Sequence, residues 1–217
     1  MRLIFATGNE GKLREAREIL GPGCEVLGPA DLGLDAEVEE TGSTFRENSL
    51  IKAKYLFDRC GLPCFADDSG LEVDALGGAP GIYSARYASD HNFASNIDRL
   101  LAELAVLPPQ EFALRAHPTT PSGHLPLQTF PSAARFRCVV TLMLSDGTPH
   151  FFDGSCEGRI ATKRHGAGGF GYDPVFVPDA FPDRTIAELP EDVKNAISHR
   201  GDALRKMAEY LNCSNPE

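Results

Sequence analysis

The sequence predicts an α/β protein, organised as one soluble domain or as two lobes that share a core. Residues 3–6 form a compact apolar run that passes through a glycine-containing loop into an amphipathic helix. Residues 44–60 predict a second helix, which precedes an apolar run that ends at Asp67. Residues 135–156 alternate and turn like a β-hairpin. With 217 residues, 42% of them hydrophobic, the chain can build a sizeable core.

The first strand and helix frame a candidate phosphate-binding loop. Apolar residues recur at helical spacing from Leu13 to Leu20, and the helix ends at residues 21–23, Gly-Pro-Gly. The loop before it consists of Thr7, Gly8, Asn9, Glu10, Gly11 and Lys12. Backbone N–H groups and the positive end of the helix dipole would face an anion there, and Lys12 adds a full charge. The loop is not a Walker A sequence, and a helix capped by Thr7 or Asn9 with an exposed lysine explains it equally well.

Residues 24–40 predict a short second strand and a connection that becomes acidic towards Glu40. The next helix starts with a capping-box pattern, Thr44 followed by Glu47. Within this helix Lys52 and Lys54 are two residues apart, so they point to different faces. One of them can serve catalysis while the other is solvated, and without the surrounding motif both would be assigned to solvent.

The stretch from residue 65 to residue 74 is the strongest candidate for chemistry. Asp67 and Asp68 follow a short apolar run and are followed at once by Ser69 and Gly70. We expect this pair at the end of a strand, where α/β proteins hold ligands, and there it favours a metal site or a general base. An Asp-Ser-Gly turn that only reverses the chain is the alternative. A glycine-rich segment, residues 76–88, allows the backbone to approach a ligand closely.

The second half of the chain adds one further candidate site. Residues 92–107 predict an amphipathic helix, and residues 108–134, with six prolines, predict a long surface loop whose His117 and His124 are solvated rather than metal ligands. Residues 166–176 combine glycines, two aromatic rings and an acid, which suits a flat heterocycle. The alternative is a glycine-bulged strand with core aromatics. The last helix is expected at residues 202–211, with Ser198, His199 and Arg200 offering donors just ahead of it.

Charge and cysteine usage narrow the class of protein. The net charge of -10 makes nucleic-acid binding an unlikely main function, although a divalent cation would let an acidic protein bind a polyphosphate. The six cysteines form no Cys-x-x-Cys pair and indicate neither a zinc site nor a disulfide framework. No apolar run has the length of a signal peptide core or a membrane span. We therefore expect a reduced, cytoplasmic protein without membrane partners.

Four blocks in this order closely resemble the inosine triphosphate pyrophosphatase family, which hydrolyses non-canonical purine nucleoside triphosphates. The blocks are Thr7-Gly8-Asn9-x-x-Lys12, Glu40-Thr41-Gly42-x-Thr44-Phe45-x-Glu47-Asn48, Ala66-Asp67-Asp68-Ser69-Gly70-Leu71 with Gly81-Ile82-Tyr83-Ser84-Ala85-Arg86-Tyr87, and Gly169-Phe170-Gly171-Tyr172-Asp173-Pro174 with Ser198-His199-Arg200. The resemblance covers residues 3–211 as a single pyrophosphatase domain, followed by a tail at 212–217. Only the loop at 108–134 departs from it, as an insertion.

The resemblance implies a fold, an activity and an assembly. The fold is α/β, with two lobes around a long mixed central β-sheet, flanking helices and a nucleotide cleft between the lobes. The activity is Mg²⁺-dependent hydrolysis of ITP, dITP and XTP to the monophosphate and pyrophosphate, and the assembly is a homodimer. A pyrophosphatase of pyrimidine or modified nucleotides and a non-catalytic nucleotide sensor are the alternatives.

The resemblance also implies a role for each matching residue. Residues 7–12 would hold the triphosphate with help from Lys52, and Ser69 would touch the substrate. Glu40 and Asp68 would bind the metal, and Asp68 would take the proton of the attacking water. Phe170 would stack on the base within the block that continues through Gly171, Tyr172 and Asp173. Asp173 and Lys194 would line the nucleotide pocket, and His199 and Arg200 would contact the edge of the purine.

Overall fold

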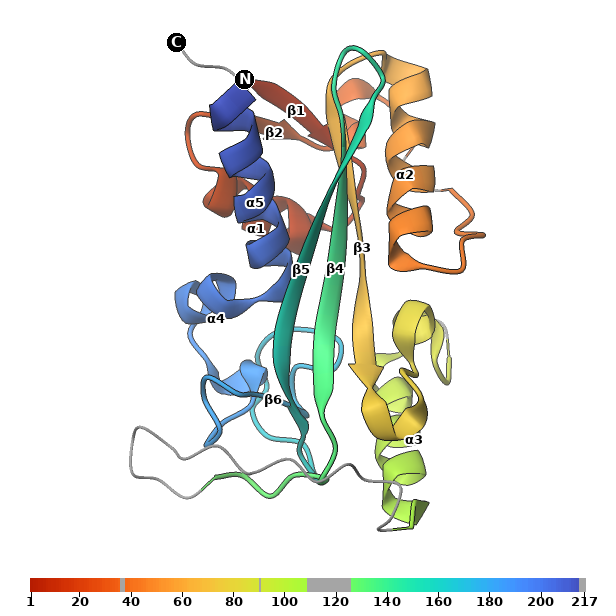
Figure 1. The fold of residues 1–217 in the computed structure, drawn as a ribbon, viewed down its shortest axis with the longest axis vertical. Helices are drawn as coiled ribbons and strands as arrows, with labels where there is room; N and C mark the ends of the chain where they lie inside the picture. Colours follow the sequence, from red (N-terminus) through yellow and green to blue (C-terminus); the bar gives the residue numbers. More distant parts are fainter. Residues whose placement is uncertain (36–37, 90, 109–125, 215–217) are drawn as a thin grey trace. The chain divides into compact units, whose positions relative to one another are not determined.

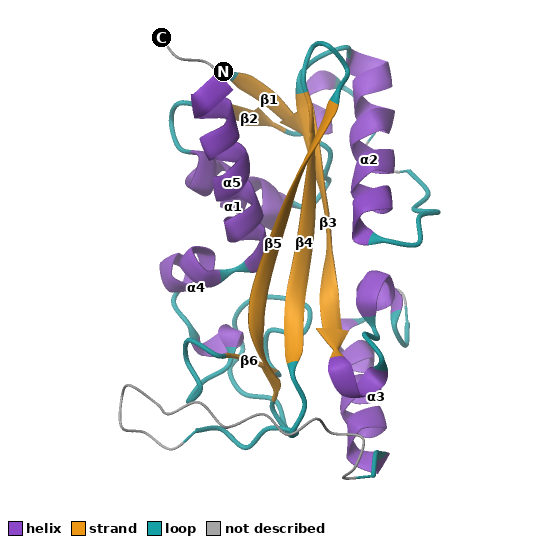
Figure 2. Cartoon of the chain, in the orientation of Figure 1, coloured by secondary structure: helices purple, strands orange, loops and turns teal. Residues whose placement is uncertain are grey.

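The computed structural model describes residues 1–35, 38–89, 91–108 and 126–214 of the chain and has an α/β fold. Its strands form one six-stranded sheet in the order β2-β1-β3-β4-β5-β6, drawn as arrows in Figures 1 and 2. Strand β1 runs parallel to β2 and β3, whereas β5 and β6 are antiparallel, so the sheet is mixed. The α/β fold class with flanking helices is therefore confirmed.

The structure contains most of the regular elements that the sequence patterns predict, and it adds α4 and β6. The strands are β1 (Arg2–Phe5), β2 (Glu25–Leu27), β3 (Cys64–Val73), β4 (Ala134–Met143), β5 (Pro149–Ile160) and β6 (Phe176–Pro178). The helices are α1 (Glu10–Leu20), α2 (Phe45–Cys60), α3 (Phe93–Val106), α4 (Glu191–Ile197) and α5 (His199–Ser214). The expected early strands, the hairpin and the helices at 12–20, 44–60 and 92–107 are all present.

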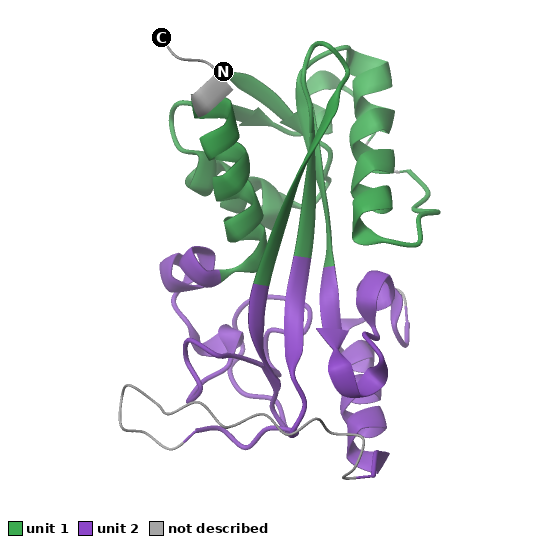
Figure 3. Cartoon of the chain, in the orientation of Figure 1, with its two compact units in different colours: residues 1–69, 138–155, 198–217 green, residues 70–137, 156–197 purple. Residues whose placement is uncertain are grey.

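The chain forms two compact units, coloured separately in Figure 3. Unit 1 contains residues 1–69, 138–155 and 198–217, and unit 2 contains residues 70–137 and 156–197. Strands β3, β4 and β5 are long enough to contribute residues to both units. Each unit has a hydrophobic core of its own and is therefore compactly packed.

In unit 1, helices cover both faces of the sheet: α1 and α5 lie on one face and α2 lies on the other (Figure 1). The alternation of strand residues explains this arrangement, because successive side chains point to opposite faces. Leu3, Phe5 and Phe65 pack in one cluster with residues of α1 and α5. Ile4 and Ala66 pack in another cluster with residues of α2. The next two residues of β3 continue this alternation, and they are the paired aspartates.

The paired aspartates lie inside a strand, and the prediction that they end one is wrong. Strand β3 continues through Asp67 and Asp68 to Val73, which also rules out the Asp-Ser-Gly turn. The two aspartates still lie near the carboxyl end of a parallel strand, where α/β proteins bind ligands, but that strand is β1. Parallel strand β1 ends at Phe5, which is paired with Phe65, so the two carboxylates extend past the carboxyl end of β1.

Two further expectations about local structure need correction. Residues 166–170 are irregular with bends and residues 171–175 form a turn, so there is no bulged strand here and β6 starts only at Phe176. Helix α5 starts at His199, three residues earlier than expected, so His199 and Arg200 belong to its first turn. Ser198 supports this start, because its hydroxyl accepts a hydrogen bond from Gly201 N at 2.9 Å.

The helix caps follow the sequence with one difference. Asn9 caps α1 by accepting a hydrogen bond from Lys12 N at 3.1 Å. Thr44 caps α2 in the same way through Glu47 N. The Glu47 carboxylate, however, accepts from Ser43 N at 2.7 Å, one residue before the position that a capping box requires.

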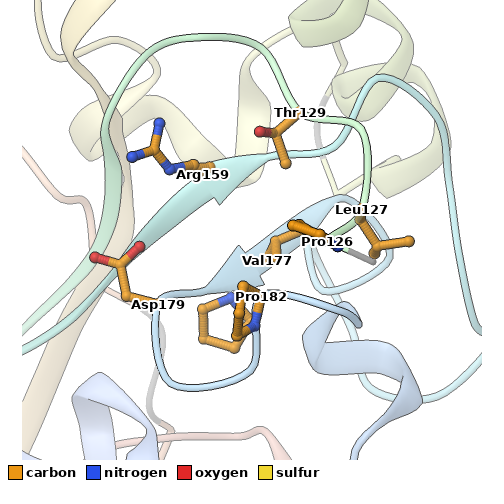
Figure 4. Close-up of a pocket in the computed structure, with 8 residues that line it drawn as sticks. Pro126, Leu127, Thr129, Arg159, Val177, Asp179 and Pro182 are labelled. Atoms are coloured by element: carbon orange, nitrogen blue, oxygen red, sulfur yellow. The ribbon is translucent and has the colours of Figure 1, made fainter. Parts of the chain in front are cut away.

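The proline-rich segment is only partly described. Residues 109–125, with His117 and His124, lie outside the described residues. From residue 126 onward the segment runs beside unit 2 strands, where Phe130 N donates to Ile160 O at 2.8 Å. It forms one wall of a small pocket, shown in Figure 4. The pocket is lined by Pro126, Leu127, Thr129, Arg159, Val177, Pro178, Asp179 and Pro182.

Two further findings concern the cysteines and the helices of the described residues. Cys24, Cys60, Cys64, Cys138 and Cys156 are free thiols. Within the described ranges, no helix combines the length and the apolar character needed to cross a membrane.

Candidate active site

Asp67 is the centre of a buried ion cluster on the α1 and α5 face of unit 1. Lys12 Nζ lies 2.9 Å from Asp67 Oδ1, and Arg200 Nε lies 2.9 Å from Asp67 Oδ2. Arg200 Nη1 also binds Glu15 Oε2 at 2.6 Å, and Arg200 Nη2 lies 3.4 Å from Ser69 Oγ. Asp67 and Arg200 are each only 2% exposed. Both carboxylate oxygens of Asp67 are therefore committed to holding two cations.

Asp68 belongs to a separate cluster on the α2 face. Lys52 Nζ bridges two carboxylates, at 2.7 Å from Glu40 Oε1 and 3.1 Å from Asp68 Oδ1. Asp68 is 8% exposed, and its second oxygen, Oδ2, is buried without a hydrogen-bond partner among the described residues. Adjacent residues of one strand thus serve two different sets of partners, because their side chains point to opposite faces.

The two environments shift the pKa values of the paired aspartates in opposite directions. Burial alone would raise the pKa of Asp67, but the charges of Lys12, Arg200 and Lys52 outweigh it and hold the pKa far below its usual range. For Asp68 burial prevails over the attraction of Lys52, so its pKa is raised. Asp67 is a permanent anion, whereas Asp68 is the better proton acceptor.

Glu40 and Asp68 have the chemistry of a magnesium site. Mg²⁺ is commonly held by one or two carboxylates together with phosphate oxygens of a substrate. The unpartnered Asp68 Oδ2 is an oxygen of the type that a hard cation binds, and a buried anionic atom without a partner is costly unless something binds it. Across the described part of the chain, no cluster of three or more His, Cys, Asp or Glu side chains has a metal-binding arrangement. The residues therefore fit a cation that is bound partly by Glu40 and Asp68 and partly by the oxygens of a bound phosphate.

The loop between β1 and α1 is suited to an anion. Asn9 accepts from Lys12 N, which leaves Glu10 and Gly11 as first-turn residues whose N–H groups have no acceptor within the helix. Thr7 Oγ1 accepts from Asn9 N at 3.2 Å, and an added Cβ at Gly8 would meet no atom within 4 Å. Lys12 uses one of its three donors on Asp67, so two remain for a phosphate.

Unit 2 presents an aromatic ring with a charged support. Phe170 is 41% exposed, and Lys194 Nζ lies 4.7 Å from its ring centroid. Asp173 Oδ2 accepts from both Lys194 Nζ at 2.7 Å and Phe170 N at 2.9 Å. A Cβ at Gly169 would lie 2.0 Å from Asp173 Oδ2, and Gly169 has a φ of 73°. Glycine at this position lets the carboxylate fix the loop that displays the ring.

The remaining predicted residues have different environments. Tyr172 is a core residue of unit 2, 3% exposed, whose hydroxyl donates to Ser84 O at 3.0 Å. Gly171 has a φ of 61° in the turn that connects Phe170 to Tyr172. His199 is partly buried at the start of α5. The substrate contacts assigned to these three residues stay predictions.

Sequence reasoning missed Glu15, which holds Arg200 in place together with Ser198. Glu15 is 7% exposed and accepts from Ser198 Oγ at 3.1 Å as well as from Arg200. One signal was available, because Glu15 lies on the same helical stripe as Ala16 and Ile19, which are apolar. An acid on a buried stripe is seldom unpaired. Its partner, 185 residues later in the chain, could not be identified from spacing.

Comparison with known proteins gives a consistent result. The model of the Ham1 family matches residues 3–120 and 125–210. The chain is 42% identical over 214 residues to a dITP/XTP pyrophosphatase of Porphyromonas gingivalis, covering 98% of both chains. It is 43% identical to a protein of the same name from Yersinia pseudotuberculosis, covering 97% of this chain and 98% of the other.

Solved structures agree over the whole chain. A HAM1 protein from Coxiella burnetii superposes with a TM-score of 0.78 at 36% identity and 98% coverage of both chains. A nucleoside-triphosphatase / dITP/XTP pyrophosphatase from Mycobacterium abscessus superposes with a TM-score of 0.71 at 37% identity, covering 97% of this chain and 99% of the other.

The Asp67 cluster predicts a pH-dependent stability defect for Arg200→Met. Without the guanidinium, Asp67 and Glu15 become poorly compensated buried anions, which costs about 3–5 kcal/mol at pH 7. The folded-state pKa of native Asp67 is depressed, so its stabilising contribution is present above the unfolded pKa and falls as pH drops. In the variant Asp67 loses one of the cations that lower its pKa, so protonation of this buried carboxyl group relieves part of the cost. The defect measured by urea unfolding should therefore be smaller at pH 5 than at pH 7.

Arg2→Met is the matched control, because it removes an arginine from an exposed pair with Glu25. Its effect should stay below about 1 kcal/mol. Equal losses in the two variants would contradict the structural role given to Arg200.

Proposed function

The chain belongs to the Ham1 family, and on that basis we propose that it is a Mg²⁺-dependent enzyme that hydrolyses ITP, dITP and XTP to the monophosphate and pyrophosphate. It acts on a phosphoric anhydride, breaking the bond between the α and β phosphates. The relatives named above as dITP/XTP pyrophosphatases support this substrate class.

One observation carries the proposal: Asp68 Oδ2 is a buried carboxylate oxygen without a described partner, beside Glu40 and the bridging Lys52. Hydrolysis needs a water directed at phosphorus, an anion to accept its proton, and positive charge on the phosphate oxygens. Asp68 has the raised pKa of a proton acceptor. Lys52 holds Oδ1 of Asp68, which leaves Oδ2 as the oxygen open to the cation or to the proton of the attacking water.

Positive charge at the phosphates comes from several sources. Lys12 and the N–H groups of the loop at residues 7–11 bind the triphosphate. Mg²⁺, held by Glu40 and Asp68, neutralises charge on the phosphate oxygens when it is bound. Lys52 keeps the two carboxylates together before substrate arrives. The leaving pyrophosphate departs with its charge shared among these groups.

The base is recognised by stacking and by hydrogen bonds. The exposed ring of Phe170 stacks on the purine, and Asp173 with Lys194 holds that ring in position. His199 and Arg200 address the oxygen at position 6, which adenine lacks. Arg200 already bonds Asp67, Glu15 and Ser69, which fixes the position from which its guanidinium can address the base. A site that hydrogen-bonds such an oxygen can reject a mismatched base by up to about 10⁴-fold.

The setting of the reaction follows from the same assignment. We propose that the enzyme acts as a homodimer in the cytoplasm, where it removes non-canonical nucleotides from the pool. The five free thiols of the described chain suit a reducing compartment. Analytical ultracentrifugation of the purified protein tests the dimer.

A substrate panel tests the activity. With Mg²⁺, pyrophosphate release should be fast for ITP, dITP and XTP and slower by orders of magnitude for ATP, because adenine lacks the position-6 oxygen. Removing Mg²⁺ with a chelator should abolish turnover. Equal rates for ATP and ITP would contradict the proposed selectivity. Preference for pyrimidine or modified nucleotides, or tight binding of ITP without turnover, would favour the two alternative functions.

Asp68→Asn should lower kcat by about 10²–10⁴-fold, because the proton acceptor is lost while the shape is kept. ITP binding, measured by calorimetry, should persist. Asp58→Asn is the matched control, since Asp58 is an exposed carboxylate paired with Lys54 on α2. A near-native rate in Asp68→Asn would remove Asp68 from the mechanism.

Phe170→Ala should raise KM for dITP, because base stacking on an aromatic ring is worth about 1–3 kcal/mol. That energy corresponds to roughly 5–150-fold in KM, with kcat little changed. Tyr83→Ala is the control: Tyr83 is another exposed aromatic residue of unit 2, 56% exposed, that the proposal does not use. Parallel KM changes in both variants would refute the stacking role.

A further inference from the structure

The segment that carries Glu40 is fastened to the first turns of α2. Glu40 reaches Lys52, but it belongs to a connection without regular structure between residues 38 and 44. A metal-binding carboxylate on such a connection needs other contacts to fix its position. Those contacts start two residues later, at Gly42.

Asn48 makes the closest of these contacts. Gly42 N donates to Asn48 Oδ1 at 2.8 Å, and Asn48 is 0% exposed. A Cβ at Gly42 would lie 2.6 Å from Asn48 Oδ1 and 2.7 Å from Glu47 Cβ. Glycine therefore allows an approach that any other residue would block. Ser43 and Thr44 extend the attachment through their hydrogen bonds with Glu47.

The Asn48 amide also carries a cost that demands an explanation. Its Nδ2 atom is buried and has no hydrogen-bond partner among the described residues. An unpaired buried donor is unfavourable, and an apolar side chain would avoid it. What asparagine supplies at this position is the acceptor for Gly42 N. Asn48 also lies one helical turn before Lys52, so both side chains are on the same face of α2. Asn48 fixes the connection on this face, and Lys52 binds Glu40 there.

We propose that Asn48 is a positioning residue that, with Gly42, holds the Glu40 carboxylate beside Lys52 and Asp68 and so sets the affinity for the divalent cation. The inference rests on the proposed function, because it assigns a metal to Glu40 and Asp68. It adds a residue that touches neither metal nor nucleotide. Loss of the Asn48 acceptor releases the connection at residues 38–44. Part of the binding free energy of the cation is then used to order Glu40, so the cation binds more weakly.

The test measures metal binding directly in the substrate-free protein. Mn²⁺ is the probe, and free Mn²⁺ is followed by electron paramagnetic resonance. Asn48→Ala and Gly42→Ala should each weaken Mn²⁺ binding by about 10–100-fold, the usual effect of removing a partner of a metal ligand. The double variant should be no weaker than either single one, because both break the same contact. The Mg²⁺ concentration for half-maximal dITP hydrolysis should rise equally, and kcat should recover at saturating Mg²⁺.

Ser49→Ala is the matched control for a merely structural effect. Ser49 is the next residue of α2, also 0% exposed, and its hydroxyl meets Thr141 Oγ1 at 2.6 Å without touching the Glu40 segment. It should lower Tm but leave Mn²⁺ binding unchanged. Native Mn²⁺ affinity in Asn48→Ala and Gly42→Ala, or an equal loss in Ser49→Ala, would overturn the inference. If the variants show this pattern of Mn²⁺ binding but the native protein hydrolyses no purine nucleoside triphosphate, the proposed function is refuted and the positioning role is supported.

Discussion

The alternation of side chains along β3 is the constraint on which the site depends. Because neighbouring residues of a strand face opposite sides, Asp67 and Asp68 form their ion pairs with different side chains even though they are adjacent in sequence. Asp67 faces the layer of α1 and α5, where Lys12 and Arg200 hold it. Asp68 faces α2, where Lys52 meets it. A pair that looks like one acidic site in the sequence is two sites in the fold.

This separation divides the work between the two carboxylates. Asp67 is held by Lys12 and by the buried Arg200, so it is a fixed anion that joins β3 to α1 and α5 of unit 1. A carboxylate with one cation on one oxygen and none on the other keeps an atom for chemistry. Had the cations been spread evenly over Asp67 and Asp68, neither would combine a raised pKa with an unpartnered oxygen. With the ion cluster on one face, the carboxylate on the other face keeps a raised pKa and an oxygen without a described partner.

Sequence patterns predicted the parts of this site that depend on neighbours along the chain. The helix after the first strand, its Asn9 cap and the start of α2 at Thr44 follow from local spacing and side-chain chemistry. The assignment of Asp67 and Asp68 to a strand end failed, because acids and glycine resemble a turn until the apolar residues on both sides are paired in a sheet. The bond from Arg200 to Glu15 was also beyond local reasoning, since a contact across 185 residues leaves no spacing to detect.

The charges around the site explain how a protein with a net charge of -10 can bind a polyphosphate. On the α2 face, Glu40 and Asp68 outnumber the single ammonium of Lys52, so the cluster is negative by one charge. A divalent cation reverses that sign and turns a repulsive surface into an attractive one. On the opposite face, the charges of Lys12 and Arg200 are matched by Asp67 and Glu15, so this cluster offers hydrogen-bond donors to a phosphate but no net positive charge. In the proposed mechanism the metal at Glu40 and Asp68 therefore supplies the net positive charge that these two clusters lack, and whatever fixes Glu40 also fixes the position of that charge.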